Sequence, residues 1–200
     1  PSRDSKTSFV LYEKELMNYI QMVMPQMQGV VMSDYGSGTI TPKIRDLILS
    51  LSKEYDIPSI IDSRYAIFNF VGTDYVKQND AELASAVGYK IDNEEILYKA
   101  AQEFLVKMQA KVILVKKKKK GMTLFEANGD VHNIPVSDKS EVFDVSGAGD
   151  TCVATFITAL ATGAMPSQAA ELSNFASGIA VRKMGTATVS DEELIAVLKK

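Results

Sequence analysis

Apolar residues recur along this 200-residue chain at two different spacings. Leu16, Ile20 and Val23 lie three and four residues apart, which places them on one face of a helix. Short unbroken apolar runs such as residues 112–115 are typical of strands buried on both faces. The polar residues 1–8 indicate that the chain enters its first helix without a preceding strand. The spacings predict helices over residues 11–27, 42–55, 80–88, 93–109, 151–162, 167–183 and 191–199, and strands over 29–33, 58–62, 71–76, 111–115, 122–126 and 131–134.

Short strands alternate with longer helices through most of the chain, and the last two strands read as a hairpin around Asn128 and Gly129. This alternation is typical of an α/β fold with a doubly wound, mostly parallel sheet and helices on both faces. No internal repeat and no Pro- or Ser-rich linker interrupts the pattern. Residues 1–200 are therefore expected to form a single α/β domain.

Charge and residue counts exclude several functions. The 22 Lys and Arg against 25 Asp and Glu give a formal charge of −3, which argues against a general binder of nucleic acid or of a membrane surface. Cys152 is the only cysteine, so no internal disulfide and no multi-cysteine metal site can form. His132, the only histidine, is interpreted as structural or solvated. We assign no residue as a direct metal ligand, and we expect a cytoplasmic location.

Ligands of such sheets bind beyond the carboxyl ends of the strands. The residues at those positions are Asp34, Asp62, the lysine run 116–120 and the segment 144–151. Asp34, Asp62 and Asp144 are therefore candidates for either substrate contact or a structural role.

The segment 144–151 has the composition of an anion site. Gly147, Ala148 and Gly149 can turn tightly and leave backbone N–H groups bare at the start of a helix. Asp150 on the rim could accept a proton from a substrate hydroxyl while those N–H groups hold a transferring phosphoryl. The alternative is that the glycines only shape a turn and Asp150 caps the helix.

Residues 144–151, DVSGAGDT, resemble the C-terminal signature of the ribokinase-like carbohydrate kinases, also called the PfkB family. The resemblance implies that Asp150 is the catalytic base and that Gly147, Ala148 and Gly149 form the anion hole. It continues through residues 174–181 and through Gly185-Thr186.

The resemblance also assigns roles outside the signature. Asn174 lies by the adenine pocket of the family, and Asn79 with Glu82 fits an Asn-x-x-Glu element that influences magnesium and phosphate binding. The remaining candidate nucleotide-binding residues after the fourth predicted strand are Lys116, Lys118 and Gly121. Five adjacent lysines are, however, more typical of a solvated loop.

Segments 33–36, 121–124 and 185–190 look closest to the D-glycero-D-manno-heptose 7-phosphate kinase domain of ADP-heptose synthesis. The chain departs from that subfamily at Ser37, where a lysine is usual, and at residues 62–64, where Asp-Ser-Arg replaces Asp-Pro-Lys. Family members are longer, so the N-terminal strands and the β lid that grips the sugar are expected to be missing here.

The implied function is ATP-dependent phosphoryl transfer to a hydroxyl of a sugar or sugar phosphate, with ATP and Mg²⁺ as cofactors. The sequence does not name the sugar. A small-molecule partner is expected, with no nucleic acid and no membrane, and because lids of this family commonly mediate dimers, a homodimer stays open. The alternative is a catalytically idle nucleotide-binding or interaction module of the same fold.

Overall fold

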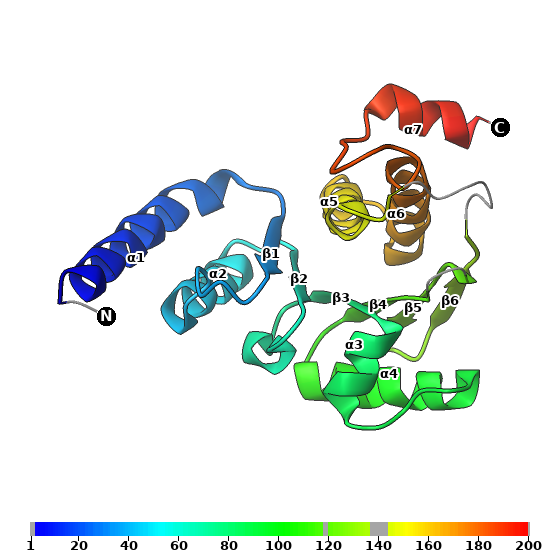
Figure 1. Ribbon diagram of the computed structural model, residues 1–200, viewed down its shortest axis with the longest axis horizontal. Coiled ribbons are helices and arrows are strands. Elements are labelled where there is room, and N and C mark those ends of the chain that lie inside the picture. Colours follow the sequence, from blue (N-terminus) through cyan, green and yellow to red (C-terminus); the bar gives the residue numbers. More distant parts are fainter. Residues whose placement is uncertain (1–2, 118–119, 137–143, 200) are drawn as a thin grey trace.

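The computed structural model describes residues 3–117, 120–136 and 144–199. Its centre is a sheet whose strands follow one another in chain order, β1-β2-β3-β4-β5-β6 (Figure 1). Strands β1 to β4 are parallel, and β5 and β6 complete the sheet as an antiparallel meander. The strands are β1 (Val30–Asp34), β2 (Ser59–Ser63), β3 (Tyr75–Asn79), β4 (Val112–Lys116), β5 (Met122–Glu126) and β6 (Val131–Ile134).

Helix boundaries follow local capping signals. The Thr41 side chain accepts a hydrogen bond from the Ile44 N–H at 3.3 Å and caps α2, with Pro42 in its first turn. Gly88 ends α3 in the left-handed conformation at φ 83°. The helices are α1 (Arg3–Val23), α2 (Pro42–Glu54), α3 (Asp80–Val87), α4 (Glu94–Met108), α5 (Ala148–Ala161), α6 (Pro166–Ala180) and α7 (Asp191–Leu198), with short 3-10 turns η1 (Met24–Gln26) and η2 (Ile67–Phe70).

Helices cover both faces of the sheet. Helices α2, α3 and α4 share one buried core with Ile61, Val76 and Ile113 of the strands. Helices α5 and α6 pack on the opposite face, against Ile60 and Leu114, and Figure 1 shows them across the sheet from α3 and α4. The central strands β2, β3 and β4 are thus buried on both faces, as parallel sheets require, whereas the edge strands β1 and β6 are partly exposed. The mostly parallel α/β sheet with helices on both faces is confirmed.

Several predicted boundaries were wrong, among them three element starts. Helix α1 begins at Arg3 rather than at residue 11, because the mainly polar residues of its first two turns extend the helix without adding to its apolar face. Strand β3 begins at Tyr75 rather than at residue 71, since Gly72 is left-handed at φ 94° and the Thr73 N–H donates to the Phe70 carbonyl. Helix α5 begins at Ala148 rather than at residue 151.

Candidate active site

The glycine-rich turn leads directly into α5. Gly147 is the N-cap residue, and its φ of 75° is a left-handed conformation that favours glycine. The Ala148 N–H donates to the Val145 carbonyl at 3.3 Å, and the Thr151 N–H donates to the Gly147 carbonyl at 2.8 Å. The N-cap carries no side-chain capping bond, so Asp150 does not cap the helix.

Asp150 instead meets a tyrosine from the far side of the site. It is exposed in the first turn of α5, and the Tyr35 hydroxyl donates to its Oδ1 at 3.0 Å and its Oδ2 at 3.1 Å. Burial raises the pKa of Tyr35, and the hydrogen bond to Asp150 raises it further. Tyr35 therefore remains a protonated hydrogen-bond donor at neutral pH.

A buried ion pair lies directly beneath the turn. Lys77 of β3 is 7% exposed, and its Nζ donates to Asp62 Oδ2 of β2 at 2.7 Å. A Cβ placed on Gly149 would lie 3.3 Å from Lys77 Nζ and 3.7 Å from Asp62 Oδ2. The absence of a side chain at Gly149 thus lets the backbone of α5 approach a buried cation.

Two of the predicted acidic residues build loops. Asp144 Oδ1 accepts from the Ser146 N–H at 2.8 Å, and Oδ2 accepts from the Gly185 N–H at 3.1 Å. These N–H donors hold the pKa of Asp144 below its usual value. Asp34 likewise accepts from the Gly36 N–H and from the Ser63 hydroxyl, both at 2.9 Å. The geometry favours the structural alternative for Asp34 and Asp144.

Asn79 and Glu82 bind each other at the start of α3. The Asn79 side chain accepts from the Glu82 N–H at 2.8 Å, and Glu82 Oε2 accepts from the Asn79 N–H at 2.7 Å. This is a capping box, so both residues have a structural role in holding the helix end. Asn79 pairs in register with Lys116, so the element stands at the carboxyl edge of the sheet.

The described lysines of the run differ in exposure, since Lys116 and Lys117 are partly buried and Lys120 is exposed. Lys116 ends β4, and Lys118 and Lys119 lie outside the described residues. The Lys117 side chain is 13% exposed, with its Nζ 3.4 Å from both Glu94 Oε1 and Asn133 Oδ1. The prediction of a solvated loop is therefore wrong for Lys117, because a carboxylate and an amide oxygen partner its charge.

Gly121 and Asn174 hold the region beyond β4 together. Gly121 is left-handed at φ 84°, and a Cβ there would overlap the Ile134 carbonyl oxygen, so the β5–β6 hairpin requires glycine. Asn174 on α6 is 7% exposed, and its Nδ2 donates to the Pro135 carbonyl at 2.7 Å. Gly121 and Asn174 therefore each stabilise the fold, independently of any contact with a ligand.

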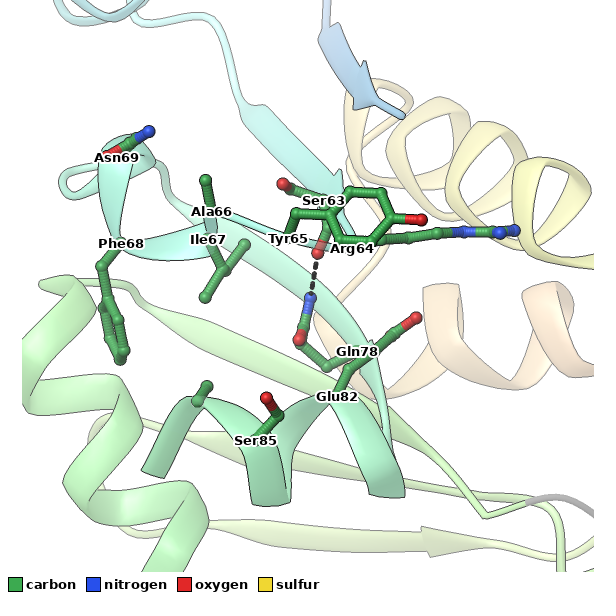
Figure 2. A pocket seen from close by; sticks show the side chains of 11 residues that line it. Ser63, Arg64, Tyr65, Ala66, Ile67, Phe68, Asn69, Gln78, Glu82 and Ser85 are labelled. Carbon is green, nitrogen blue, oxygen red and sulfur yellow. Dashed lines mark hydrogen bonds between the residues drawn. The ribbon is translucent and has the colours of Figure 1, made fainter. Parts of the chain in front are cut away.

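A cavity of about 220 Å³ lies between the β2–η2 loop and α3. Figure 2 shows Glu82 among its lining residues and the hydrogen bond by which Gln78 Nε2 donates to the Ser63 carbonyl at 3.0 Å. Arg64 extends from the rim on the side of α5, and its guanidinium carbon lies 4.8 Å from the centre of the Tyr35 ring. The cavity therefore adjoins the Asp150 region.

Sequence reasoning missed Lys77 and the contacts of Tyr35 and Arg64. Lys77 carries one signal, since a charged residue near the carboxyl end of an otherwise buried parallel strand requires a partner. Tyr35 gives no comparable signal, because its contact with Asp150 joins residues 115 positions apart.

Among the described residues, no three His, Cys, Asp or Glu side chains gather in a way that could hold a metal ion. Within the same part of the chain, no helix has the length and apolar character needed to cross a membrane.

Known proteins resemble the chain in sequence and in fold. The family described as pfkB family carbohydrate kinase matches residues 30–193. The curated Bifunctional protein HldE of Paramagnetospirillum magneticum is 36% identical over 187 residues, which are 93% of this chain and 38% of that protein. The HldE of Hyphomonas neptunium is 38% identical over the same shares. The chain thus spans well under half the length of these curated relatives.

Solved structures agree on the fold. The ribokinase of Arabidopsis thaliana, complexed with ribose and ATP, superposes with a TM-score of 0.78 at 20% identity. The match covers 90% of this chain and 58% of the ribokinase chain. Phosphofructokinase-2 from Escherichia coli superposes with a TM-score of 0.77 at 19% identity, over 92% of this chain and 61% of the phosphofructokinase chain. The ribokinase-like fold implied by residues 144–151 is confirmed.

Proposed function

The chain belongs to the pfkB family of carbohydrate kinases, and on that premise we propose that it binds ATP at the start of α5 and transfers the terminal phosphoryl to a sugar hydroxyl. One arrangement carries the proposal. The exposed carboxylate of Asp150 follows Gly149 in the first turn of α5, and the buried cation of Lys77 lies next to the position that a Gly149 side chain would take. A base, a phosphate-binding cation and the N–H groups of a helix N-terminus at one place are what phosphoryl transfer requires.

Asp150 acts as the general base in this proposal. It accepts the proton of the acceptor hydroxyl as the oxygen attacks phosphorus, the bond to the bridging oxygen breaks, and ADP leaves. The N–H groups at Gly147 and Gly149 and the α5 N-terminus stabilise the charge on the transferred group. The Ala148 N–H contributes less, since it already donates to Val145.

The nucleotide is proposed to lie along the carboxyl edge of the sheet. Lys77 contacts its phosphates, Lys116 adds positive charge at the end of β4, and Asn174 with Gly121 shapes the base pocket. Magnesium would neutralise phosphate charge, with the second carboxylate oxygen of Glu82 available to its water shell. One protein carboxylate plus phosphate oxygens is a usual donor set for this ion, so Glu82 fits it.

The acceptor is proposed to be a sugar phosphate, and heptose 7-phosphate is the first candidate. Two independent observations support this choice of acceptor. The curated HldE relatives match over 93% of the chain, and Arg64 offers an exposed guanidinium, stacked on the Tyr35 ring that contacts the base, for a second phosphate.

Calorimetric titration of ADP with Mg²⁺ tests nucleotide binding, and Asp150→Asn tests the base. In the intact protein, assayed with a panel of sugar phosphates, Asp150→Asn should lower the transfer rate by about 10² to 10⁴ while ADP affinity stays unchanged. Asp191→Asn makes the same substitution in the first turn of α7 and should change neither the transfer rate nor the ADP affinity. Turnover of Asp150→Asn within threefold of the parent would refute the role of Asp150 as general base. ADP binding without any transfer would favour the idle module.

A further inference from the structure

Tyr35 occupies the place on Asp150 that an acceptor hydroxyl must take. Its oxygen is 3.0 Å from Oδ1 and 3.1 Å from Oδ2, so it is nearly equidistant from the two carboxylate oxygens. A general base receives its proton from a hydroxyl that donates to it in the same way. Until an acceptor arrives, the tyrosine hydroxyl therefore lies within hydrogen-bond distance of both oxygens and shares its one proton between them.

The phenol is held there from two sides. The Asp34 carboxylate fixes the loop after β1 by accepting from Gly36 and Ser63, and the Arg64 guanidinium lies over the tyrosine ring. Tyr35 as a whole nevertheless remains 50% exposed. The contact is thus preformed but open to solvent, which allows a ligand hydroxyl to displace it without rearrangement of the core.

We propose that Tyr35 determines acceptor specificity by keeping water off the base. The proposal rests on the proposed role of Asp150 as general base. In hydrolysis a water oxygen attacks the terminal phosphorus of ATP, the bond to the bridging oxygen breaks, and the water proton passes to Asp150. Water competes poorly for positions that the phenol already occupies, whereas a sugar phosphate brings binding contacts of its own and displaces the phenol.

The test is ATP hydrolysis by the full chain without sugar. Tyr35→Phe removes one oxygen and keeps the ring, and we expect it to raise hydrolysis about tenfold, which corresponds to ~1.4 kcal/mol and to the net value of one hydrogen bond. ADP affinity should not change. Tyr65→Phe is the matched control, because that side chain is 78% exposed in the neighbouring loop, and it should leave hydrolysis at the parental rate.

Two further variants separate the proposed cause from a general loosening of the site. Tyr35→Phe combined with Asp150→Asn should hydrolyse ATP no faster than Asp150→Asn alone, since the added water needs the base. Arg64→Ala, which frees the ring, should raise hydrolysis in the same direction as Tyr35→Phe.

The outcomes distinguish the two proposals. Unchanged or slower hydrolysis by Tyr35→Phe, with ADP binding intact, would overturn the specificity role of Tyr35. So would a rise that persists in the double variant, or mass-spectrometric detection of phosphate on the Tyr35 oxygen. Failure of the parent chain to bind ADP would instead overturn the proposed nucleotide site.

Discussion

The ion pair beneath the turn allows stability and ligand binding to be separated. Lys77 Nζ and Asp62 Oδ2 are 2.7 Å apart, and the two side chains are 9% and 11% exposed. Asp62→Ala leaves a cation with little access to water and no carboxylate partner. Lys77→Met with Asp62→Ala leaves no buried charge at all. The ADP affinity should depend only on whether Lys77 is present. The free energy of unfolding should depend on whether the two charges are both present, both absent, or reduced to one.

The expected magnitudes follow from this burial. Breaking a buried pair by removing one partner costs about 3–5 kcal/mol, so Asp62→Ala should lose that much unfolding free energy. The double variant should recover most of it, because an apolar replacement of both charges is often neutral. Lys77→Met should weaken ADP binding about 10- to 100-fold, since a hydrogen bond to a charged group contributes about 1.5–3 kcal/mol. Asp62→Ala should bind ADP at least as tightly as the parent.

Urea denaturation and ADP calorimetry on the four proteins measure both quantities. Lys111→Met is the control, because Lys111 is 66% exposed in its pair with Asp74, and it should cost no more than about 1 kcal/mol and leave ADP binding unchanged. Equal weakening of ADP binding by Asp62→Ala and Lys77→Met would show that Lys77 acts only through the fold and would refute its role in nucleotide binding. A double variant as unstable as Asp62→Ala would refute the assignment of the stability loss to an unpaired buried charge.

Two further predictions concern the loops that hold the site. Gly121→Ala should lose more than about 4 kcal/mol in urea denaturation, because its Cβ would overlap the Ile134 carbonyl. A Cβ on Gly129 would have no atom within 4 Å, so Gly129→Ala should lose only about 1–2 kcal/mol of unfolding free energy, from the strain of a left-handed alanine. Equal losses in the Gly121 and Gly129 variants would contradict the overlap at Gly121. Because the folded-state pKa of Asp144 is lowered, its stabilisation is present above its unfolded pKa near 4 and is lost as pH falls through the folded value. Asp144→Asn should therefore flatten the acid limb of the stability profile, and an unchanged limb would contradict this.

Local signals were sufficient for most of the fold. Thr41, Pro42 and Gly88 mark helix ends by chemistry that acts within a few residues, and each stands at the predicted end. Residues 144–151 likewise identified the family from one contiguous segment. The start of β3 was missed because the turn at Gly72 lies within an apolar stretch and is held against the end of α4 by a hydrogen bond from the Gly72 N–H to the Met108 carbonyl, and no local pattern reports that distant partner.

The site was predictable only where its parts are contiguous. Gly147, Gly149 and Asp150 could be found together because one turn carries them all. Lys77 is adjacent to Gly149 only after β3 and α5 have packed on each other. Tyr35 meets Asp150 for the same reason, across 115 positions of sequence.

Asp34, Asp144 and Asp150 are of two kinds that sequence position does not distinguish. Asp34 and Asp144 each accept from one N–H two residues further along the chain and from a second donor on a distant segment, and the loops that they fix carry Tyr35 and Gly147. Asp150 instead receives its hydrogen bond from the half-exposed side chain of Tyr35, on the first of those loops. A carboxylate that joins two segments through both oxygens determines where a loop lies, whereas Asp150 faces whatever enters the site. Substitution of the first kind should therefore alter activity by moving Tyr35 or Gly147, while substitution at Asp150 removes the reacting group itself.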